Sequence, residues 1–319
     1  MNLDSFIEIC HKPLGNKGED AFAYDLRRDD VHALAVFDGC GGAGAWKYPE
    51  YRNATGAFIA AHSMAGSFYR WIEKMSAADT QDSEGLAFGL SEVSGRTLSD
   101  LKQSCSPMGV AGSLVKSFPC TVSAAVLTPD PAGGLALTAL SVGDSRVYIL
   151  TPETGLLQVT KDDSRGHPDP LDSLRENAPL SDMLNADKPY KIKHRRIRLQ
   201  TPFAVMCATD GIFGFARSPM DFEYQLLEAL DDASSFAEFE DRLKETVMKT
   251  TGDDCTCLMA FYGWKKFDRL RKDLRRRSAY VKTLVKMIDE TKDAAGEDAV
   301  IREIWKTYKT AAVLDEMKV

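Results

Sequence analysis

The stretch Val36-Phe37-Asp38-Gly39-Cys40-Gly41-Gly42 decides the fold of this chain, because an apolar run stops there at an acid followed by glycines. A strand that ends at Asp-Gly leaves its carboxylate at the rim of a sheet, where the backbone is free to approach a ligand. Three other stretches join an apolar or β-rich run to an acid and a small or turn-forming residue: KGEDAF at 17–22, CATDGIF at 207–213 and TGDDCT at 251–256.

The acids of these stretches predict a metal site. Carboxylates gathered at one rim repel one another unless cations lie among them. Hard divalent ions such as Mg²⁺ or Mn²⁺ prefer oxygen ligands. We therefore expect five side chains to converge from distant parts of one fold: Glu19, Asp20, Asp38, Asp210 and Asp253.

The composition narrows the class of protein. The chain has 319 residues, of which 44% are hydrophobic, and a net charge of −7. These values suit a soluble globular protein and argue against non-specific nucleic-acid binding. No apolar run is long enough to predict a membrane-spanning helix, and the start MNLDSFIEIC lacks the pattern of a signal peptide. Seven cysteines without a disulfide or zinc spacing predict reduced thiols in a cytoplasmic protein.

Apolar periodicity predicts strands with helices inserted between them in pairs. Strands are expected at 5–10, 21–26, 31–37, 121–127, 135–142, 146–150, 191–199, 203–208 and 255–262. Between the third and fourth strands we expect one helix with an apolar face of Met64, Phe68, Trp71 and Met75, and another at 84–103. Two more helices are expected within 222–250. Helix pairs between groups of mostly antiparallel strands favour an α+β fold.

The chain changes character after Gly263. One long helix is expected at 264–290, with an apolar stripe from Phe267 to Ile288, and a second helix at 298–314. The long helix carries many cations, which form either a solvated face or a docking surface for an acidic partner: Lys265, Lys266, Arg269, Arg271, Lys272, Arg275, Arg276 and Arg277. We expect one domain at 1–263 and a helical extension at 264–319, on which a partner protein could dock.

Five segments together resemble a known family. GEDAF, FDGCGG, SVGDSRVY, CATDGIF and DDCT, in this order between about residues 16 and 261, are similar to the signature segments of the metal-dependent protein phosphatases (protein phosphatase 2C-like). The resemblance implies a four-layer αββα sandwich, in which two central, mostly antiparallel sheets are flanked by helix pairs. It also implies that phosphoserine or phosphothreonine in a protein substrate is hydrolysed by water activated at two Mg²⁺ or Mn²⁺ ions.

The resemblance also implies a role for each acid. Asp38 would bridge both ions. Asp210 and Asp253 would complete the shell of the first ion. The second would be served by Glu19, by Asp20 through water and by the carbonyl of Gly39, where a side chain would hinder the approach to the ion.

Three charged residues near these segments are expected to have supporting roles. Asp254 stands where many relatives carry Asn, and it could hold a metal-bound water or steady the loop. Asp144 and Arg146 of SVGDSR are expected to form a buried ion pair that fixes a turn between two core strands.

Three positions depart from the family's pattern. Many relatives carry His directly after Asp-Gly, where it is thought to protonate the leaving alkoxide; Cys40 stands there, and a thiol is a weaker donor. Gly15 stands where relatives carry an Arg that holds the phosphate, and Lys17 or Lys12 could replace it as a point charge. At about Phe118, where some members have an Asp for a third ion, we see no third protein ligand.

These departures leave two interpretations open. The first is an active enzyme, with Asp38, Cys40 and Lys17 as its catalytic residues, and the complete set of metal acids favours it. The second is a catalytically weak, phosphatase-like module that binds a partner or a phosphoprotein as a regulatory scaffold. Cys40 could also be a redox-sensitive thiol, because cations lower the pKa of a thiol.

Three other kinds of site match the sequence less well: a dinucleotide site, a cysteine-based phosphatase site and a nucleic-acid site. The run from Gly39 to Gly44 fits G-x-G-x-x-G after a strand, but a dinucleotide site needs a helix to open at once and an acid at the end of the next strand. A cysteine-based phosphatase needs an Arg six residues after Cys40, and Trp46 is there. Nucleic-acid binding by the cations after Gly263 is not expected, because no stacking aromatics interleave with them.

Overall fold

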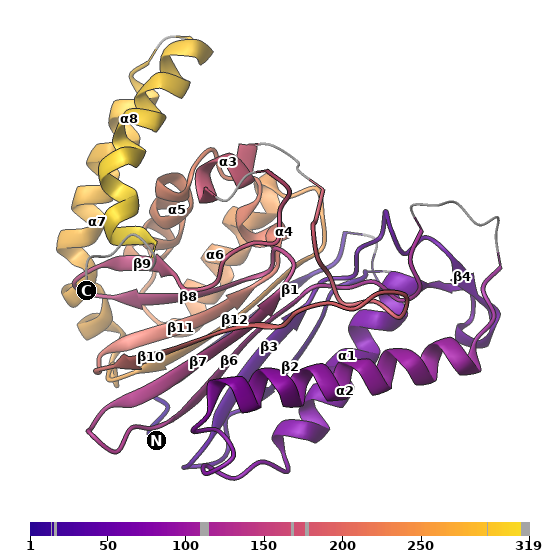
Figure 1. Ribbon diagram of the computed structural model, residues 1–319. Coiled ribbons are helices and arrows are strands. Elements are labelled where there is room, and N and C mark those ends of the chain that lie inside the picture. The colour runs from indigo at the N-terminus through magenta and orange to yellow at the C-terminus, as the bar shows by residue number, and fades with distance from the viewer. Residues whose placement is uncertain are drawn as a thin grey trace.

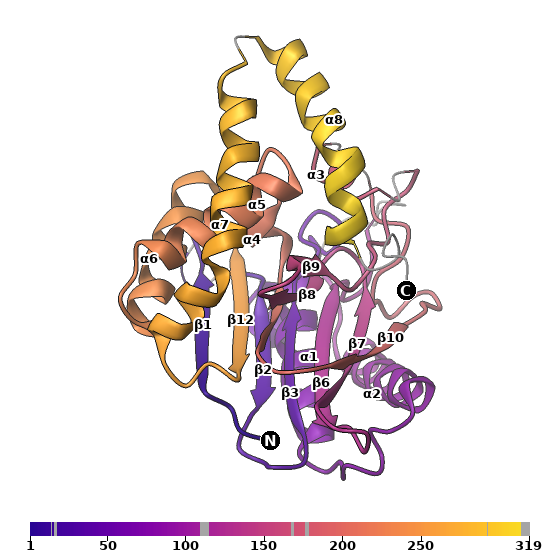
Figure 2. The ribbon, with the colours of Figure 1, turned by 90° about the vertical axis from the view of Figure 1, so that its left-hand side faces the viewer.

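The computed structural model describes residues 1–13, 15, 18–108, 115–166, 169–175, 179–291 and 293–313. Two five-stranded sheets lie face to face, and helices cover the outer face of each (Figures 1 and 2). Helices α1 (Gly56–Ile72) and α2 (Ser83–Ser104) lie on one side, and helices from the C-terminal half lie on the other. The expected α+β sandwich of four layers is confirmed.

The first sheet has the strand order β1-β12-β11-β8-β9, and all neighbouring strands are antiparallel. Its strands are β1 (Ser5–His11), β12 (Cys255–Tyr262), β11 (Phe203–Ala208), β8 (Arg146–Thr151) and β9 (Gly155–Gln158).

The second sheet has the order β10-β7-β6-β3-β2 and is also antiparallel throughout. Its strands are β10 (Lys193–Leu199), β7 (Leu135–Val142), β6 (Val122–Pro129), β3 (His32–Phe37) and β2 (Ala21–Asp25). Strands β4 (Lys47–Tyr48) and β5 (Ala54–Thr55) form a separate small hairpin around the 3₁₀ turn Pro49–Tyr51. All nine expected strands are present, with ends that differ by at most two residues. The short strands β4, β5 and β9 were not expected, because two to four residues show no clear period.

Strand β3 shows how the sequence builds the layers. Leu34 and Val36 face the first sheet and are buried in the core between the two sheets. Ala33, Ala35 and Phe37 point the other way and pack in the core under α1 and α2. Because successive side chains of a strand point to opposite faces, an uninterrupted apolar run indicates a strand that is covered on both sides.

Four of the remaining helices lie where helices were expected: α5 (Pro219–Asp231), α6 (Phe236–Thr250), α7 (Phe267–Asp289) and α8 (Ala294–Ala312). The short helices α3 (Pro170–Arg175) and α4 (Asp210–Phe213) were not expected. Helix α8 begins four residues before the expected Asp298, because the Asp293 carboxylate accepts the backbone N–H of Gly296 at 2.8 Å and caps the helix earlier. None of the described helices combines the length and the apolar run that crossing a membrane requires.

Helices α7 and α8 form a hairpin whose tip projects from the body of the molecule (Figure 2). Near its base, Trp264, Leu270, Ile301 and Trp305 are buried in the same hydrophobic cluster as α5, α6 and the outer face of the first sheet. The hairpin therefore packs against the core. The division of the chain at residue 263 stays a prediction.

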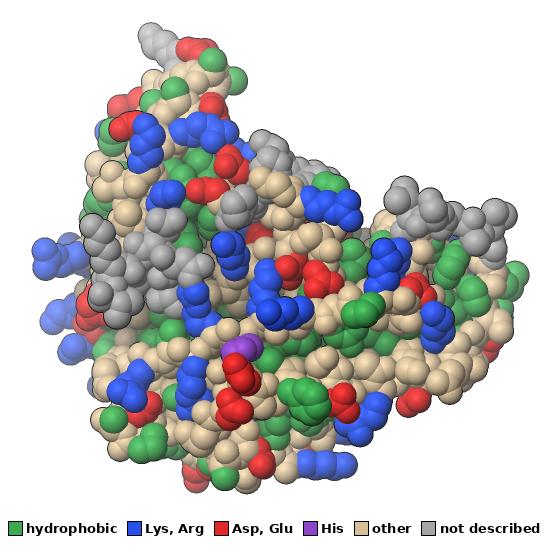
Figure 3. Space-filling view, viewed as in Figure 1, with side chains coloured by type: hydrophobic (Ala, Val, Ile, Leu, Met, Phe, Trp, Pro, Cys, Tyr) green, Lys and Arg blue, Asp and Glu red, His purple; other side chains and the backbone are tan. Residues whose placement is uncertain are grey.

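A buried ion pair fastens this hairpin to α5. The guanidinium of Arg277 in α7 donates to both oxygens of Glu223, at 2.7 and 2.6 Å, and the hydroxyl of Tyr308 in α8 donates to the same carboxylate. The Glu223 side chain is fully buried. Most other Lys and Arg side chains of α7 are exposed on the outer side of the molecule (Figure 3).

Candidate metal centre

The strand register brings the predicted acids to one edge of the sandwich. Asp38 directly follows β3, and Glu19 and Asp20 directly precede β2, whose first residue pairs with the last of β3. In the other sheet, Asp210 follows β11 and Asp253 precedes β12, and these two strands pair at the same ends. Since the two sheets face each other, acids from four separate segments meet at one edge.

The electrostatics of Asp38 agree with this convergence. Burial raises the pKa of Asp38 well above its usual value, and the neighbouring carboxylates of Asp210, Asp20, Asp144 and Asp253 raise it further. A buried carboxylate among four others is costly in its charged form, because like charges repel strongly where water is excluded.

Asp20, Asp210 and Glu19 show the same perturbation. Burial raises the pKa of Asp20 to about 7, although hydrogen bonds from Thr209 and Thr256 oppose the shift. Burial, followed by the charge of Asp253, raises the pKa of Asp210 to about 6. The pKa of Glu19 is also raised, first by burial, against the hydrogen bond from Thr55.

The surroundings fit divalent cations in their chemistry. The donors are carboxylates and a nearby backbone carbonyl, which are the ligands that Mg²⁺ and Mn²⁺ prefer. One buried oxygen, Asp144 Oδ1, has no hydrogen-bond partner among the described residues. The described side chains do not hold three His, Cys, Asp or Glu groups in ready-made coordination geometry. The assignment of Glu19, Asp20, Asp38, Gly39, Asp210 and Asp253 as ligands therefore stays a prediction.

Threonines that the sequence had not singled out orient two of the acids. The Thr209 hydroxyl donates to Asp20 Oδ2 at 2.8 Å and itself accepts the backbone N–H of Thr256 at 2.9 Å. The Thr55 hydroxyl donates to the carboxylate of Glu19. Thr209 directly precedes Asp210, and Thr55 caps α1, so each is placed by an element boundary that the sequence does indicate.

Asp254 steadies the loop, which was one of its two expected roles. Its carboxylate accepts the backbone N–H of Glu19, and it thereby joins the start of β12 to the segment before β2. This bond fixes Glu19 relative to Asp253, the next residue in the chain from Asp254.

Glycine is required at position 39 by close packing. A Cβ at Gly39 would lie 2.8 Å from the carbonyl oxygen of Ala57 and 2.8 Å from Cβ of Glu19. A Cβ at Gly41 would collide with the Glu19 carboxylate. The loop after β3 can therefore pass beside Glu19 only without side chains at these two positions.

The other residues with a predicted catalytic role are Cys40 and Lys17, with Lys12 as the alternative to Lys17. Burial raises the pKa of the Cys40 thiol well above its usual value, and Asp38 is the next cause. Lys17 lies outside the described residues. Lys12, its alternative, donates from Nζ to the backbone oxygen of Asp20 at 2.8 Å and so holds the loop of the acids. Phe118 is buried and offers no ligand.

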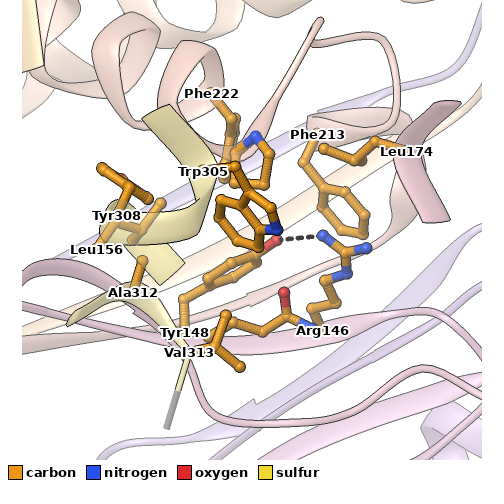
Figure 4. A pocket seen from close by; sticks show the side chains of 12 residues that line it. Arg146, Tyr148, Leu156, Leu174, Phe213, Phe222, Trp305, Tyr308, Ala312 and Val313 are labelled. Carbon is orange, nitrogen blue, oxygen red and sulfur yellow. Dashed lines mark hydrogen bonds between the residues drawn. The ribbon is translucent and has the colours of Figure 1, made fainter. Parts of the chain in front are cut away.

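The expected ion pair between Asp144 and Arg146 is wrong. Arg146 instead forms two bonds with Asp162, from Nη2 at 2.7 Å and from Nε at 3.0 Å. Arg146 is the first residue of β8, and its side chain lies with Tyr148 on the helix-covered face of the sheet (Figure 4). There, Cζ of Arg146 lies 4.2 Å from the centroid of the Phe213 ring. Asp162 follows β9, the neighbour of β8, and reaches the same face.

Asp144 belongs to the acid cluster instead. It lies in the turn between β7 and β8, at the edge where the other acids meet. Burial and the charge of Asp210 raise its pKa to about 8. The motif SVGDSR offered no signal for this, since the partner of Arg146 comes from sixteen residues further along the chain.

Comparisons with known proteins agree with this arrangement. The family model described as protein phosphatase 2C matches residues 11–254. No curated protein matches the chain significantly.

Several solved structures share the fold. A serine/threonine phosphatase Stp1 from Staphylococcus aureus has 16% identity and a TM-score of 0.60, and the match covers 82% of this chain and 97% of that one. The catalytic domain of the serine/threonine phosphatase PstP in complex with two manganese ions has 16% identity and a TM-score of 0.54, with 81% and 97% covered. A C. elegans sex determining protein has 17% identity and a TM-score of 0.59, with 86% and 68% covered. The family model spans most of the sequence, and the chain belongs to the protein phosphatase 2C family.

Proposed function

We propose that this protein is a metal-dependent phosphatase that hydrolyses phosphoserine or phosphothreonine in proteins at a centre of two Mg²⁺ or Mn²⁺ ions. The observation that supports it most is the half-buried Asp38 surrounded by four other carboxylates. Such a cluster is unfavourable by itself and becomes favourable when divalent cations neutralise it.

Each acid of the cluster would have its own role in holding the ions. Asp38 would bridge the ions, with Asp210 and Asp253 on one side and Glu19, Asp20 and the Gly39 carbonyl on the other. Bound ions would supply charge neutralisation of the phosphoryl group and a water of lowered pKa.

Two further features of the chain bear on the reaction. The Thr209 and Thr55 hydroxyls would keep Asp20 and Glu19 oriented, which limits the reorganisation that ion binding requires. The half-buried Cys40 thiol, whose pKa is raised, holds its proton tightly and would protonate a leaving alkoxide poorly. Lys17 is proposed to attract the phosphate. A cytoplasmic location and a signalling role are part of this proposal; the first rests on the cysteine pattern and the second on the family.

The test is turnover of nitrophenyl phosphate and of a phosphothreonine peptide with Mn²⁺, with Mg²⁺ and with a chelator. Asp38→Asn should lower the rate at least about hundredfold and remove Mn²⁺ binding measured by calorimetry. Asp241→Asn changes an exposed acid of α6 and serves as the matched control. Turnover that is equal with Mn²⁺ and with the chelator would overturn the proposal, as would unchanged Mn²⁺ binding in Asp38→Asn.

A further inference from the structure

An open groove of about 690 Å³ runs between α1 and α2 on the solvent side of the helix pair. Its walls carry cations and hydroxyls, and its floor includes the half-buried Trp71, Val93 and the buried Leu101. A concave surface with an apolar floor and polar walls is the usual form of a peptide site, because the floor supplies contact area and the walls supply selectivity.

The charge of the groove is opposite to that of the whole chain. Arg70, Lys74 and Arg96 line it, and Asp100 is the one acid among the described lining residues. Within the described part of the chain, none of these three cations forms an ion pair. Arg70 donates to the Ser67 hydroxyl at 3.0 Å and Arg96 to a backbone carbonyl of its own helix, so most of their donors remain free.

Many surface cations outside the groove are matched: Arg27 pairs with Asp25, Arg217 with Asp221, and Arg242 with Glu238. Within the described residues, exposed cations of α7 also lack ion pairs, but they do not line the groove. In a chain with a net charge of −7, three unmatched cations along one concave surface create a local field that attracts acidic groups.

Two side chains, His62 and Lys12, connect one end of the groove to the loop that carries Asp20. His62 lines the groove, and its Nε2 lies 3.5 Å from Nζ of Lys12. The same Nζ donates to the backbone oxygen of Asp20 at 2.8 Å. A peptide in the groove would therefore run away from the metal centre along α1 and α2.

We propose that the α1–α2 groove binds an acidic segment of the phosphoprotein substrate, adjacent in sequence to the phosphorylated residue. This inference rests on the proposed function and adds the class of substrate: Asp- and Glu-rich sequence on one side of the phosphoresidue. Arg70, Lys74 and Arg96 select it by charge, while the apolar floor supplies contact area.

Binding is tested without catalysis, by the fluorescence anisotropy of a labelled Glu- and Asp-rich peptide in the presence of a chelator. The variant Arg70→Glu/Lys74→Glu/Arg96→Glu should weaken binding at least about tenfold, since three favourable contacts become repulsive. The same peptide with Gln and Asn in place of its acids should bind wild type at least about tenfold more weakly.

A charge-matched control is available on α7. Lys272→Glu/Arg275→Glu/Arg276→Glu changes the net charge equally, on exposed side chains of a convex helix surface. This control should bind the acidic peptide within about twofold of wild type. The milder Arg70→Gln/Arg96→Gln, checked for folding by circular dichroism, should give an intermediate loss.

Catalysis gives a second measurement that separates this inference from the proposed function. With Mn²⁺, the groove variant should raise KM for a phosphopeptide with flanking acids and leave nitrophenyl phosphate turnover unchanged. If wild type binds the acidic peptide selectively but turns over neither substrate, the proposed function is refuted, whereas the proposal that the groove binds acidic segments is supported. The proposal would be refuted if the groove and α7 variants lost the same affinity for the acidic peptide. It would also be refuted if wild type did not bind the peptide at low salt.

Discussion

Replacing Asp144 by Asn should stabilise the metal-free protein, and the gain should grow with pH. Asp144 lies in the acid cluster with a pKa of about 8, raised first by burial and then by Asp210. A raised pKa means that the native protein holds this proton more tightly than the unfolded chain does. Native stability is therefore greatest below the unfolded pKa, about 4, and is lost as the pH rises toward 8.

The magnitude follows from the pKa difference. At about 1.4 kcal/mol per pH unit above the unfolded pKa, the wild-type protein loses roughly 1.5 kcal/mol by pH 5 and roughly 5 kcal/mol by pH 7.5. Asn has no proton to lose and keeps nearly the shape of a protonated Asp. The free energy of unfolding of Asp144→Asn should thus exceed that of wild type by about 3 kcal/mol more at pH 7.5 than at pH 5.

Urea unfolding in a chelator at both pH values measures this difference. A second set with Mn²⁺ should shrink or reverse the gain, because cations stabilise the carboxylate that the variant lacks. A gain of equal size at pH 5 and pH 7.5, or a loss of stability at both, would refute the view that Asp144 is a strained member of the acid cluster.

Three other substitutions probe neighbouring features. Asp162→Asn should destabilise by about 3–5 kcal/mol in urea unfolding, because Arg146 would remain buried without its carboxylate; a change below about 1 kcal/mol would show the pair to be dispensable. Glu223→Gln should cost a similar amount by leaving Arg277 unpaired, and proteolysis should then cleave the α7–α8 hairpin sooner than in wild type. Cys40→His should speed phosphoserine turnover more than nitrophenyl phosphate turnover, since an aryl leaving group needs little protonation; equal effects on both would contradict a role in proton donation.

Most of the fold was predictable because it depends on local patterns. The run at 33–37 is apolar throughout, which indicates a strand covered on both faces, and β3 is found there. The convergence of Asp38 with Asp210 was predictable for a related reason. Both acids end a strand, and strand ends in a face-to-face sandwich share an edge.

What could not be predicted depends on long-range contacts. Nothing near Arg146 in the sequence indicates Asp162, because the choice of partner depends on which sheet face the side chain occupies. Likewise, the groove between α1 and α2 needs Arg70 and Arg96 from two helices to face the same space, which periodicity within one helix does not reveal.

A cavity lies between the C-terminal hairpin and the body of the molecule, beside the short helix that carries Asp210. Trp305 and Tyr308 of α8 form one wall, and Arg146 and Phe213 form the opposite wall (Figure 4). Phe213 is the last residue of α4, the short helix that begins with Asp210, so this acid's helix rests on side chains that α8 covers.

Helix α8 also holds the segment that follows Asp162. The indole N–H of Trp305 donates to Asp169 at 2.7 Å, and Arg302 pairs with Asp172 in α3 at 3.0 Å. The hairpin thus contacts both the support of Asp210 and the chain that leads away from the Arg146–Asp162 pair. Because close-packed side chains transmit strain, we expect a displacement of α8 to shift Phe213 and, with it, the short helix that begins at Asp210.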